Sequence, residues 1–357
     1  MSNILVTGGA GYIGSHTLRV LEIKGLRPLC FDNLSTGYRE FVGGRPFFHG
    51  DLANEADLES AFASSEIAAV IHFASHALVE ESYRNPHKYY HDNILYTLNL
   101  LEAMRRHSVS HIVFSSSCAT YGIPERVPID EGERLDPINP YGTTKMVIER
   151  ILQDYQNAHG LRFVSLRYFN AAGASRDADI GEWHVPETHL IPRLLETALG
   201  NGPAAEVYGS DYPTPDGTCV RDYIHVMDLG LAHAAALDYL FAGEPSAIIN
   251  LGTGTGSSVM EVVGQVRETT GIKIPVEMKD RRPGDPPQLV ANPARARAVL
   301  GWEAQHSSLR EIVETAWNWR RGPACRALSS ARRVPWQPEC NTKMPNREKM
   351  RFKPENP

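Results

Sequence analysis

Residues 3–16 constrain the fold of this chain more than any other stretch. They open with a short apolar run at 4–6, and glycines follow at positions 8, 9, 11 and 14. Residues 12–24 then carry apolar side chains at helical spacing. Glycines let a backbone approach a pyrophosphate closely, and the N-terminus of a helix offers it free N–H groups. A strand, a tight glycine turn and a helix in this order predict a dinucleotide-binding turn, with an ordinary glycine-rich connection as the alternative.

A carboxylate follows the next apolar run. Residues 28–31 end in Asp32 and Asn33, at the distance beyond the glycines where an acidic side chain meets the adenosine ribose. A carboxylate accepts a hydrogen bond from a ribose 2′-hydroxyl and repels a 2′-phosphate. Asp32 therefore predicts that the cofactor is NAD rather than NADP.

The composition narrows the class of protein. The chain has 357 residues, 42% of them hydrophobic, which is enough for one large domain or two smaller ones. No apolar run has the length of a membrane-spanning helix, and the first residues lack the pattern of a signal peptide, so we expect a cytoplasmic protein with no membrane contact. The widely spaced cysteines match neither a disulfide framework nor a zinc site, and we expect no bound metal.

Charge is distributed unevenly along the chain. Residues 321–357 contain nine Lys/Arg and three Asp/Glu, a net +6, and because the whole chain carries −6, the rest carries −12. An acidic body gives no support for nucleic-acid binding. The basic segment holds six prolines and few apolar residues, which predicts a disordered tail, with a role at a partner or membrane surface as the alternative.

Apolar runs alternate with helical patterns through residues 1–175. The expected elements are strands near 68–73, 111–117 and 162–168 and helices near 92–107 and 140–157. This alternation predicts an α/β fold, a Rossmann-type doubly wound parallel sheet that binds the dinucleotide at the carboxyl ends of its strands.

The pattern loosens after residue 175. Segments rich in Gly, Pro and Asp alternate with short helices, and a strand near 247–252 is expected to return to the sheet. We therefore predict a dinucleotide-binding domain at 1–175 and a smaller α/β substrate lobe at 176–320, with a substrate cleft between them.

Tyr141 and Lys145 stand four residues apart at the start of a predicted helix. Residues i and i+4 share a helix face, so the phenol and the ammonium are expected to lie close together. A nearby cation favours the phenolate form of tyrosine, whose pKa is otherwise about 10. Because Ser117 ends a predicted strand upstream, these three residues predict an acid–base site beside the dinucleotide.

Several longer motifs resemble one family. They are Thr7-Gly-Gly-Ala-Gly-Tyr-Ile-Gly-Ser15, His72-Phe-Ala74, Phe114-Ser-Ser-Ser117, Pro140-Tyr-Gly-Thr-Thr-Lys145, Leu166-Arg-Tyr-Phe-Asn170, Val220-Arg-Asp-Tyr-Ile-His-Val-Met-Asp228 and Arg281-Arg-Pro-Gly-Asp285. With these motifs, residues 3–320 resemble the extended short-chain dehydrogenase/reductase family, and the 220–228 block is typical of its epimerase branch. The resemblance implies an NAD-dependent enzyme that interconverts UDP-glucose and UDP-galactose through a 4-keto sugar.

The resemblance also implies roles for residues at matching positions. Tyr141 would be the base for the sugar 4-hydroxyl, Lys145 would hold the nicotinamide ribose and lower the tyrosine pKa, and Ser117 would help to relay the proton. The implied cofactor contacts are Gly8, Gly11, Tyr12, Ile13, Gly14, Asp32, Asn33, Asp51, Leu52, Phe73, Ala74, Ser75, Asn93, Tyr141, Lys145 and Phe169. The implied substrate contacts are Ser117, Asn170, His189, Leu190, Tyr208, Arg221, Arg282, Asp285 and Leu289. Leu289 would border the space around the sugar 2-position, and a homodimer would form through the helices near 92–107 and 141–157.

Three positions depart from a common pattern of the family. His76-Ala77 stands where some relatives have Leu-Lys, so we expect a lysine contact to the cofactor phosphate to be missing. Asp92 stands where asparagine is usual, which leaves only Asn93 for the carboxamide of the cofactor, and His189 stands where some relatives have asparagine.

Two other classes of protein are alternatives to an epimerase. A nucleotide-sugar 4,6-dehydratase needs an acid–base pair beside Ser117 to expel the C6 hydroxyl, whereas Cys118-Ala119-Thr120 follows here, which speaks against dehydration. A cofactor-binding protein without catalysis could have lost Tyr141 or Lys145, and both are present.

Overall fold

The core of the molecule is a seven-stranded parallel sheet. The structure is a computed structural model and describes residues 2–282 and 285–331. The strands are β1 (Asn3–Thr7), β2 (Arg27–Asp32), β3 (Phe47–His49), β4 (Ile67–His72), β5 (His111–Ser117), β6 (Arg162–Tyr168) and β11 (Ala247–Leu251). They lie in the order β11-β6-β5-β4-β1-β2-β3, and each neighbouring pair is parallel. The predicted Rossmann-type α/β fold is confirmed.

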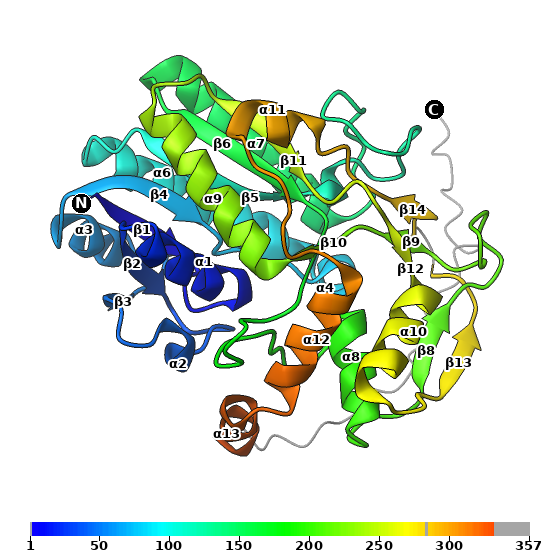
Figure 1. Ribbon diagram of the computed structural model, residues 1–357. Helices are drawn as coiled ribbons and strands as arrows, with labels where there is room; N and C mark the ends of the chain where they lie inside the picture. The colour runs from blue at the N-terminus through cyan, green and yellow to red at the C-terminus, as the bar shows by residue number, and fades with distance from the viewer. Residues whose placement is uncertain (1, 283–284, 332–357) are drawn as a thin grey trace, which may run out of the picture.

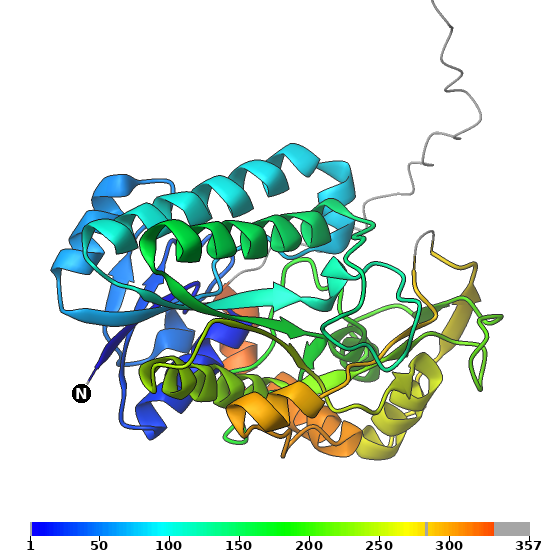
Figure 2. The ribbon, with the colours of Figure 1, turned by 90° about the horizontal axis from the view of Figure 1, so that it is seen from above.

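Helices cover both faces of this sheet (Figure 1, Figure 2). One face carries α1 (Tyr12–Ile23), α9 (Val226–Phe241) and α11 (Ala294–Leu300), and the other carries α3 (Glu55–Ala63), α6 (Tyr96–Arg106) and α7 (Pro140–His159).

Strand β1 shows how an unbroken apolar run encodes this arrangement. Ile4 and Val6 belong to the core cluster beneath α1 and α9, whereas Leu5 belongs to the cluster beneath α3, α6 and α7. All three side chains are fully buried. Because successive side chains point to opposite faces, a strand buried on both faces needs apolar residues at every position.

Helix α7 begins and ends with strong local signals. Pro140 occupies its first turn, where a missing N–H costs nothing, and the Asn139 side chain accepts a hydrogen bond from the Gly142 N–H at 2.8 Å. Gly160 ends the helix in the left-handed conformation, at φ 71°. These signals set the position of Tyr141 and Lys145 along the helix.

Shorter elements connect the layers. They are α2 (Arg39–Val42), α4 (Val79–Arg84), α5 (Pro86–Lys88), a 3-10 turn at Cys118–Thr120, β7 (Asn170–Ala172) and β10 (Tyr223–His225). The helix predicted near 92–107 begins instead as a π-helical turn, Tyr89–Leu95, which runs directly into α6.

A smaller lobe packs around its own apolar cluster. Helices α8 (Leu190–Ala198), α10 (Val259–Thr270) and α12 (Leu309–Arg320) supply most of it. Short strands flank these helices: β8 (Ala205–Tyr208) pairs with β13 (Val276–Lys279), and β9 (Val220–Arg221) lies between β12 (Ser257–Ser258) and β14 (Gln288–Leu289).

The chain crosses between the two parts more than once. Helix α9 packs against α1, and β11 pairs with β6 at the edge of the main sheet. A single boundary at residue 175 does not separate the two cores, because the first core takes in side chains from Ile224 onward as well as the strand near 247–252 that was expected to return.

The predicted disordered tail at 321–357 needs a correction. Residues 323–331 form helix α13 (Pro323–Ala331), in which Cys325 and Leu328 are buried against a cluster that includes Phe41 and Trp319. Tertiary burial of two apolar side chains outweighs the proline and the basic charges in this segment. Residues 332–357, the remainder of that prediction, lie outside the described residues.

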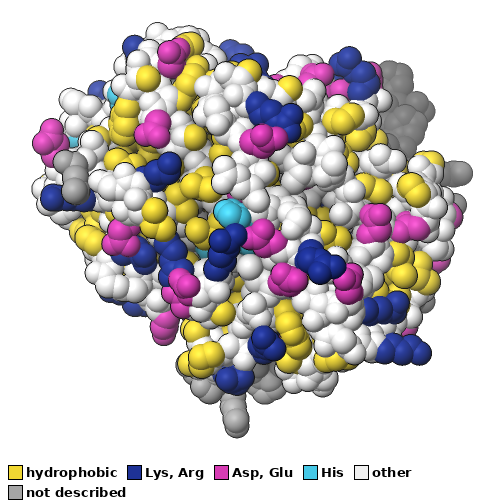
Figure 3. Space-filling model, in the orientation of Figure 1, with side chains coloured by type: hydrophobic (Ala, Val, Ile, Leu, Met, Phe, Trp, Pro, Cys, Tyr) yellow, Lys and Arg dark blue, Asp and Glu magenta, His cyan; other side chains and the backbone are white. Residues whose placement is uncertain are grey.

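Two surface properties bear on partners. Among the described residues, no helix combines the length and the apolar character needed to span a membrane. On the face seen in Figure 3, acidic and basic side chains lie interspersed, so this face gives no support for nucleic-acid binding.

Candidate active site

The predicted site residues gather at the carboxyl ends of the parallel strands. The glycine turn follows β1, Asp32 ends β2, and Phe73, Ala74 and Ser75 follow β4. Ser117 ends β5 opposite Tyr168, which ends β6. In a doubly wound sheet this edge is where ligands bind.

Two glycines of the first turn, Gly8 and Gly14, have no room for a Cβ atom. Gly8 has φ +72°, and a Cβ there would lie 2.6 Å from the backbone nitrogen of Ala74. A Cβ at Gly14 would lie 2.2 Å from the Gly8 carbonyl oxygen. The turn can therefore press against the end of β4 and leave the N-terminus of α1 open only because these positions are glycine. Tyr12, the first residue of α1, donates a hydrogen bond to the Gly173 carbonyl oxygen at 2.6 Å, which ties the turn to the end of β7.

Asp32 is held rigidly by backbone donors. Its two carboxylate oxygens accept hydrogen bonds from the Ala10 N–H at 2.9 Å and the Leu34 N–H at 2.8 Å. Burial raises the pKa of Asp32, and these donors act against that rise. Asn33 beside it donates to the Asp51 carboxylate at 2.9 Å, so two predicted cofactor residues hold each other.

The segment after β4 has a polar group in need of a partner. The Ser75 hydroxyl oxygen is buried and has no hydrogen-bond partner among the described residues. An unpaired buried hydroxyl costs about 1–3 kcal/mol unless a ligand or water satisfies it. Together with the side-chain-free glycine turn and the fixed Asp32 carboxylate, Ser75 makes these residues fit a dinucleotide.

Two of the departing positions prove to be partners. The His76 Nε2 atom lies 2.8 Å from the Asp92 carboxylate, and His91 Nδ1 lies 2.9 Å from its other oxygen. Asn93 bridges the same region, because its side chain bonds the backbone of His76 at 2.8 and 3.1 Å and the Thr144 hydroxyl at 3.2 Å. The two changes therefore complement each other, a coupling that their 16-residue separation hides in the sequence.

Ser117, Tyr141 and Lys145 are all buried, with exposures of 8, 9 and 2%. The Lys145 ammonium lies 5.7 Å from the centre of the Tyr141 ring and 4.9 Å from that of Phe114. The i, i+4 spacing therefore places phenol and ammonium together, as predicted. The Ser117 hydroxyl accepts a hydrogen bond from the Ala119 N–H at 3.1 Å.

The expected influence of Lys145 on the tyrosine does not dominate. Burial raises the pKa of Tyr141 to about 12, and hydrogen bonding with Ser117 acts in the opposite direction. Burial also lowers the pKa of Lys145 to about 7, against the attraction of Glu149. Desolvation penalises the ionised forms of both side chains at once, so the charge of Lys145 does not by itself favour the phenolate of Tyr141.

The sequence analysis did not predict a buried ionic network that includes Glu149 and Arg167, next to Lys145. Glu149, one turn after Lys145, accepts hydrogen bonds from Ser116 at 2.6 Å and from Arg167 Nε at 2.9 Å. Arg167 also donates to the Tyr121 hydroxyl at 3.0 Å. The available signal was Arg167, a charge in the buried part of strand β6, together with Glu149 one turn beyond Lys145 on α7.

Apart from His189 and Leu190, the predicted substrate residues fall into three groups. Arg221 forms an ion pair with Asp285, and its strand β9 pairs with β14 so that Arg221 lies opposite Leu289. The Arg282 guanidinium lies 3.9 Å from the centre of the Tyr208 ring. Phe169 and Leu289 share an apolar cluster with Cys118, directly after the strand that Ser117 ends, and Asn170 begins β7.

His189 and Leu190 lie at the start of α8, away from these groups in the chain. The His189 ring faces carboxylates of its own loop, with Nδ1 2.8 Å from Glu182 and 3.1 Å from Glu187. Sequence reasoning missed both glutamates, although the pattern Glu182-x-His184-x-x-Glu187-x-His189 was available.

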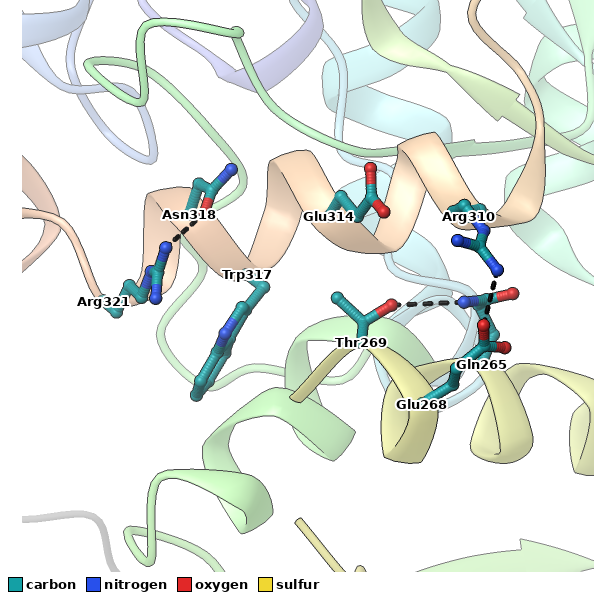
Figure 4. A pocket seen from close by; sticks show the side chains of 8 residues that line it. All are labelled: Gln265, Glu268, Thr269, Arg310, Glu314, Trp317, Asn318 and Arg321. Atoms are coloured by element: carbon teal, nitrogen blue, oxygen red, sulfur yellow. Dashed lines mark hydrogen bonds and ion pairs between the residues drawn. The ribbon is translucent and has the colours of Figure 1, made fainter. Parts of the chain in front are cut away.

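A separate groove of about 330 Å³ lies between α10 and α12 (Figure 4). It is lined by Gln265, Glu268, Thr269, Arg310, Glu314, Trp317, Asn318 and Arg321. The Arg310 and Glu268 side chains pair across it. None of the predicted site residues lines this groove, so it does not belong to the site at the sheet edge.

Known proteins resemble this chain over nearly its whole described length. The NAD dependent epimerase/dehydratase family matches residues 4–252. The UDP-glucose 4-epimerase of Rhizobium leguminosarum bv. trifolii is 51% identical over 316 residues, which cover 88% of this chain and 96% of that relative.

Solved structures agree in fold. The UDP-glucose 4-epimerase of Brucella ovis in complex with NAD is 50% identical, with a TM-score of 0.87 over 89% of this chain and 98% of that one. The enzyme of Bifidobacterium longum in complex with NAD+ and UDP is 39% identical, with a TM-score of 0.85 over 90% of this chain and 99% of that one.

The sheet, the glycine turn and the buried tyrosine–lysine pair define a dinucleotide-dependent enzyme. The predicted dependence on NAD is confirmed by the family that matches the chain. The chain belongs to the NAD dependent epimerase/dehydratase family and, within it, to the UDP-glucose 4-epimerases.

Proposed function

We propose that this enzyme interconverts UDP-glucose and UDP-galactose through a 4-keto sugar. The observation that carries the proposal is the position of Tyr141 and Lys145 in the first turns of α7, against the end of the strand that Ser117 ends. Relatives about half identical over 88% or more of the chain are UDP-glucose 4-epimerases, which supports the same reaction.

Tyr141 would take the proton from the sugar 4-hydroxyl and later return it. Ser117 would hydrogen-bond the same hydroxyl and hold it toward the phenol. Bound NAD+ would supply the acceptor for the C4 hydride and a positive charge that stabilises the buried phenolate. Lys145 would orient the nicotinamide ribose, since its ammonium is fixed beside the phenol.

The glycine turn and the acidic residues near it would hold the rest of NAD. Gly8, Gly11 and Gly14 would face the pyrophosphate with Tyr12 and Ile13, and Asp32 would bind the adenosine ribose. The remaining proposed contacts are Asn33, Asp51, Leu52, Phe73, Ala74, Ser75, Asn93 and Phe169. Support comes from the rigid Asp32 carboxylate and the unpaired Ser75 hydroxyl.

The two arginines of the smaller lobe would anchor UDP. Arg221 and Arg282 are fixed donor forks that suit a diphosphate, and Asp285 and the Tyr208 ring hold them in place. Asn170, Leu190 and Leu289 would complete the contacts. Because the hexose must turn between the two hydride transfers, tight binding at UDP and loose binding at the sugar are expected.

The proposed domains are a dinucleotide-binding part at 1–175, to which the strand near 247–252 returns, and a substrate lobe made from the rest of 176–320. A homodimer through the π-helical turn, α6 and α7 is also proposed, because Tyr90 and Leu95 on this turn are 42 and 41% exposed. Light scattering on the purified protein would measure the oligomeric state. The cytoplasmic location stays a prediction, which cell fractionation would test.

The test of the reaction is incubation with UDP-galactose and no added cofactor. We expect UDP-glucose as the product, and the Tyr141→Phe variant serves as the control. A 4-keto-6-deoxy sugar would instead indicate a dehydratase. Retention of NAD without any product would indicate a cofactor-binding protein.

A further inference from the structure

A cluster of two histidines and two glutamates lies in the loop before α8. Glu182, His184, Glu187 and His189 each offer one ligand atom, and all four atoms lie within 4.8 Å of one another. Of the four, only His189 is among the substrate contacts that the family resemblance implies, and the sequence pattern predicts no metal site. The four side chains converge on one point from eight consecutive residues.

The four histidine–glutamate distances in the cluster are close to those of a tetrahedral metal site. His189 Nδ1 lies 2.8 Å from Glu182 Oε1 and 3.1 Å from Glu187 Oε1. His184 Nδ1 lies 3.4 and 3.8 Å from the same two oxygens. A tetrahedral zinc ion with bonds of about 2.0–2.1 Å holds its ligands about 3.3 Å apart, within the range of these four distances.

His184 presents a nitrogen that lacks a hydrogen bond. Its Nδ1 atom is buried and has no hydrogen-bond partner of acceptable geometry among the described residues, although two carboxylates lie nearby. A buried ring nitrogen in this situation is unsatisfied unless a proton donor or a metal ion completes it. Imidazole nitrogen and carboxylate oxygen are both ordinary ligands of Zn²⁺.

Outer contacts hold the carboxylate of Glu187 and the backbone of Glu182. Arg320 holds the second oxygen of Glu187, Oε2, at 2.7 Å and leaves Oε1 directed at the histidines. The Trp319 indole donates a hydrogen bond to the Glu182 carbonyl oxygen at 3.0 Å. Such outer contacts are typical of metal ligands, because they fix the direction of each ligand atom.

The charge of the cluster also fits a divalent cation. The two carboxylates carry two negative charges, and an imidazole that ligates a metal has lost its extra proton and is neutral, so one Zn²⁺ would balance the four ligands. Arg320 is shared between Glu187 and Glu196, at 2.7 and 2.9 Å, and therefore does not neutralise the cluster alone.

We propose that Glu182, His184, Glu187 and His189 bind one structural Zn²⁺ ion that fastens the loop 182–189 to the start of α8. Four protein ligands leave no open position, which is the arrangement of a structural rather than a catalytic zinc. The His184 ring stands edge-on to Tyr12 of the glycine turn, with ring centres 6.5 Å apart. The ion would thus brace the turn that is proposed to bind NAD, and His189 would act through the ion rather than by touching substrate.

The test uses the full-length chain without an affinity tag. The protein is stripped with a chelator, incubated with zinc sulfate, desalted and analysed for zinc by mass spectrometry. Wild type should retain one Zn²⁺ per chain, and His184→Gln and Glu182→Gln should retain almost none. The matched control is His107→Gln, because His107 also pairs with a glutamate, at 2.8 Å from Glu59, but outside the cluster.

Two further measurements test the zinc site even if one of the variants folds poorly. Cobalt-loaded wild type should show the strong visible bands of tetrahedral N/O ligation without a thiolate charge-transfer band, and zinc should raise the Tm of wild type and His107→Gln only. Wild type that keeps no zinc, equal retention by all four proteins, or an octahedral or thiolate-bound cobalt spectrum would each overturn the site.

Discussion

The Lys145 ammonium donates a hydrogen bond to the Ser115 carbonyl oxygen at 2.8 Å. This bond joins the first turns of α7 to the end of β5, and so fixes Tyr141 near the strand that Ser117 ends. Lys145 is 2% exposed, and its charge is further linked through Glu149 to the buried Arg167. The positions of Tyr141 and Lys145 relative to Ser117 are therefore set by contact between two elements, β5 and α7. In the sequence, the end of β5 at Ser117 and the start of α7 at Pro140 are 23 positions apart.

Removing the hydroxyl of Tyr141 should slow proton transfer strongly and leave the fold intact. Tyr141→Phe should reduce turnover of UDP-galactose by about 10²–10⁴-fold, the usual contribution of a general base. The hydroxyl is the only group lost, so the content of NAD and the melting temperature should stay near those of wild type. Turnover near the wild-type value would refute the role given to Tyr141.

The buried lysine predicts a pH dependence of stability. Burial lowers the pKa of Lys145 to about 7 in the folded protein, whereas the unfolded chain keeps the proton up to about pH 10. Between these values the unfolded state binds more protons, so the free energy of unfolding should rise with pH. Urea denaturation of nucleotide-free wild type and Lys145→Met should show wild type gaining stability relative to the variant over this range. A difference that stays constant with pH would contradict the lowered pKa.

Asp32 predicts which nucleotide the purified enzyme carries. Its fixed carboxylate would repel a 2′-phosphate, so denaturing the protein and separating the released nucleotides should give NAD as the main species. Asp32→Asn removes the charge at nearly constant shape, and should lessen the discrimination against NADP in reconstitution experiments. NADP as the main nucleotide of wild type would exclude this role.

The packing of helix α13 predicts that residues 323–331 contribute to the stability of the fold. A chain ending at Gly322 loses the buried Cys325 and Leu328 and uncovers Trp319. The loss should cost about 2–4 kcal/mol of unfolding free energy and shift the tryptophan emission to longer wavelength. A chain ending at Ala331 keeps the helix and is the matched control. Equal stability of the two truncated chains would show that α13 adds nothing.

Leu289 predicts the breadth of substrates. It lies opposite Arg221 in the smaller lobe and packs with Phe169 beside Cys118. Because leucine is smaller than tyrosine and needs no hydrogen-bond partner, wild type should epimerise UDP-N-acetylglucosamine measurably. Leu289→Tyr should depress that activity selectively and spare UDP-glucose. No acetamido activity in wild type, or an equal fall of both activities, would show that Leu289 does not gate the site.

Sequence reasoning succeeded where a residue acts through its immediate neighbours. The glycines of the first turn were recognisable because their role follows from the lack of a Cβ, and a Cβ at Gly14 would meet a backbone oxygen at 2.2 Å. The pairing of Tyr141 with Lys145 follows from helix periodicity, and an unbroken apolar run identified β1 as a strand buried on both faces.

It failed where the partner of a side chain lies far along the chain. His76 and Asp92 look like independent departures but form one pair, and Glu149 and Arg167 neutralise each other in the core. Burial raises the pKa of Tyr141 and lowers that of Lys145, and the sequence could not show how far, because burial is a property of the packed site.

The sequence by itself determined the parallel sheet, the glycine turn, the closeness of Tyr141 and Lys145 and the family, because each rests on backbone conformation or on spacing within one element. Only the tertiary structure decided which charges are paired, that α13 folds onto Trp319, and that four ligand atoms of the loop 182–189 converge. The physical reason is that desolvation, ion pairing and ligand geometry depend on distances between atoms of segments that are far apart in the sequence. Those distances are set only when the segments pack against one another.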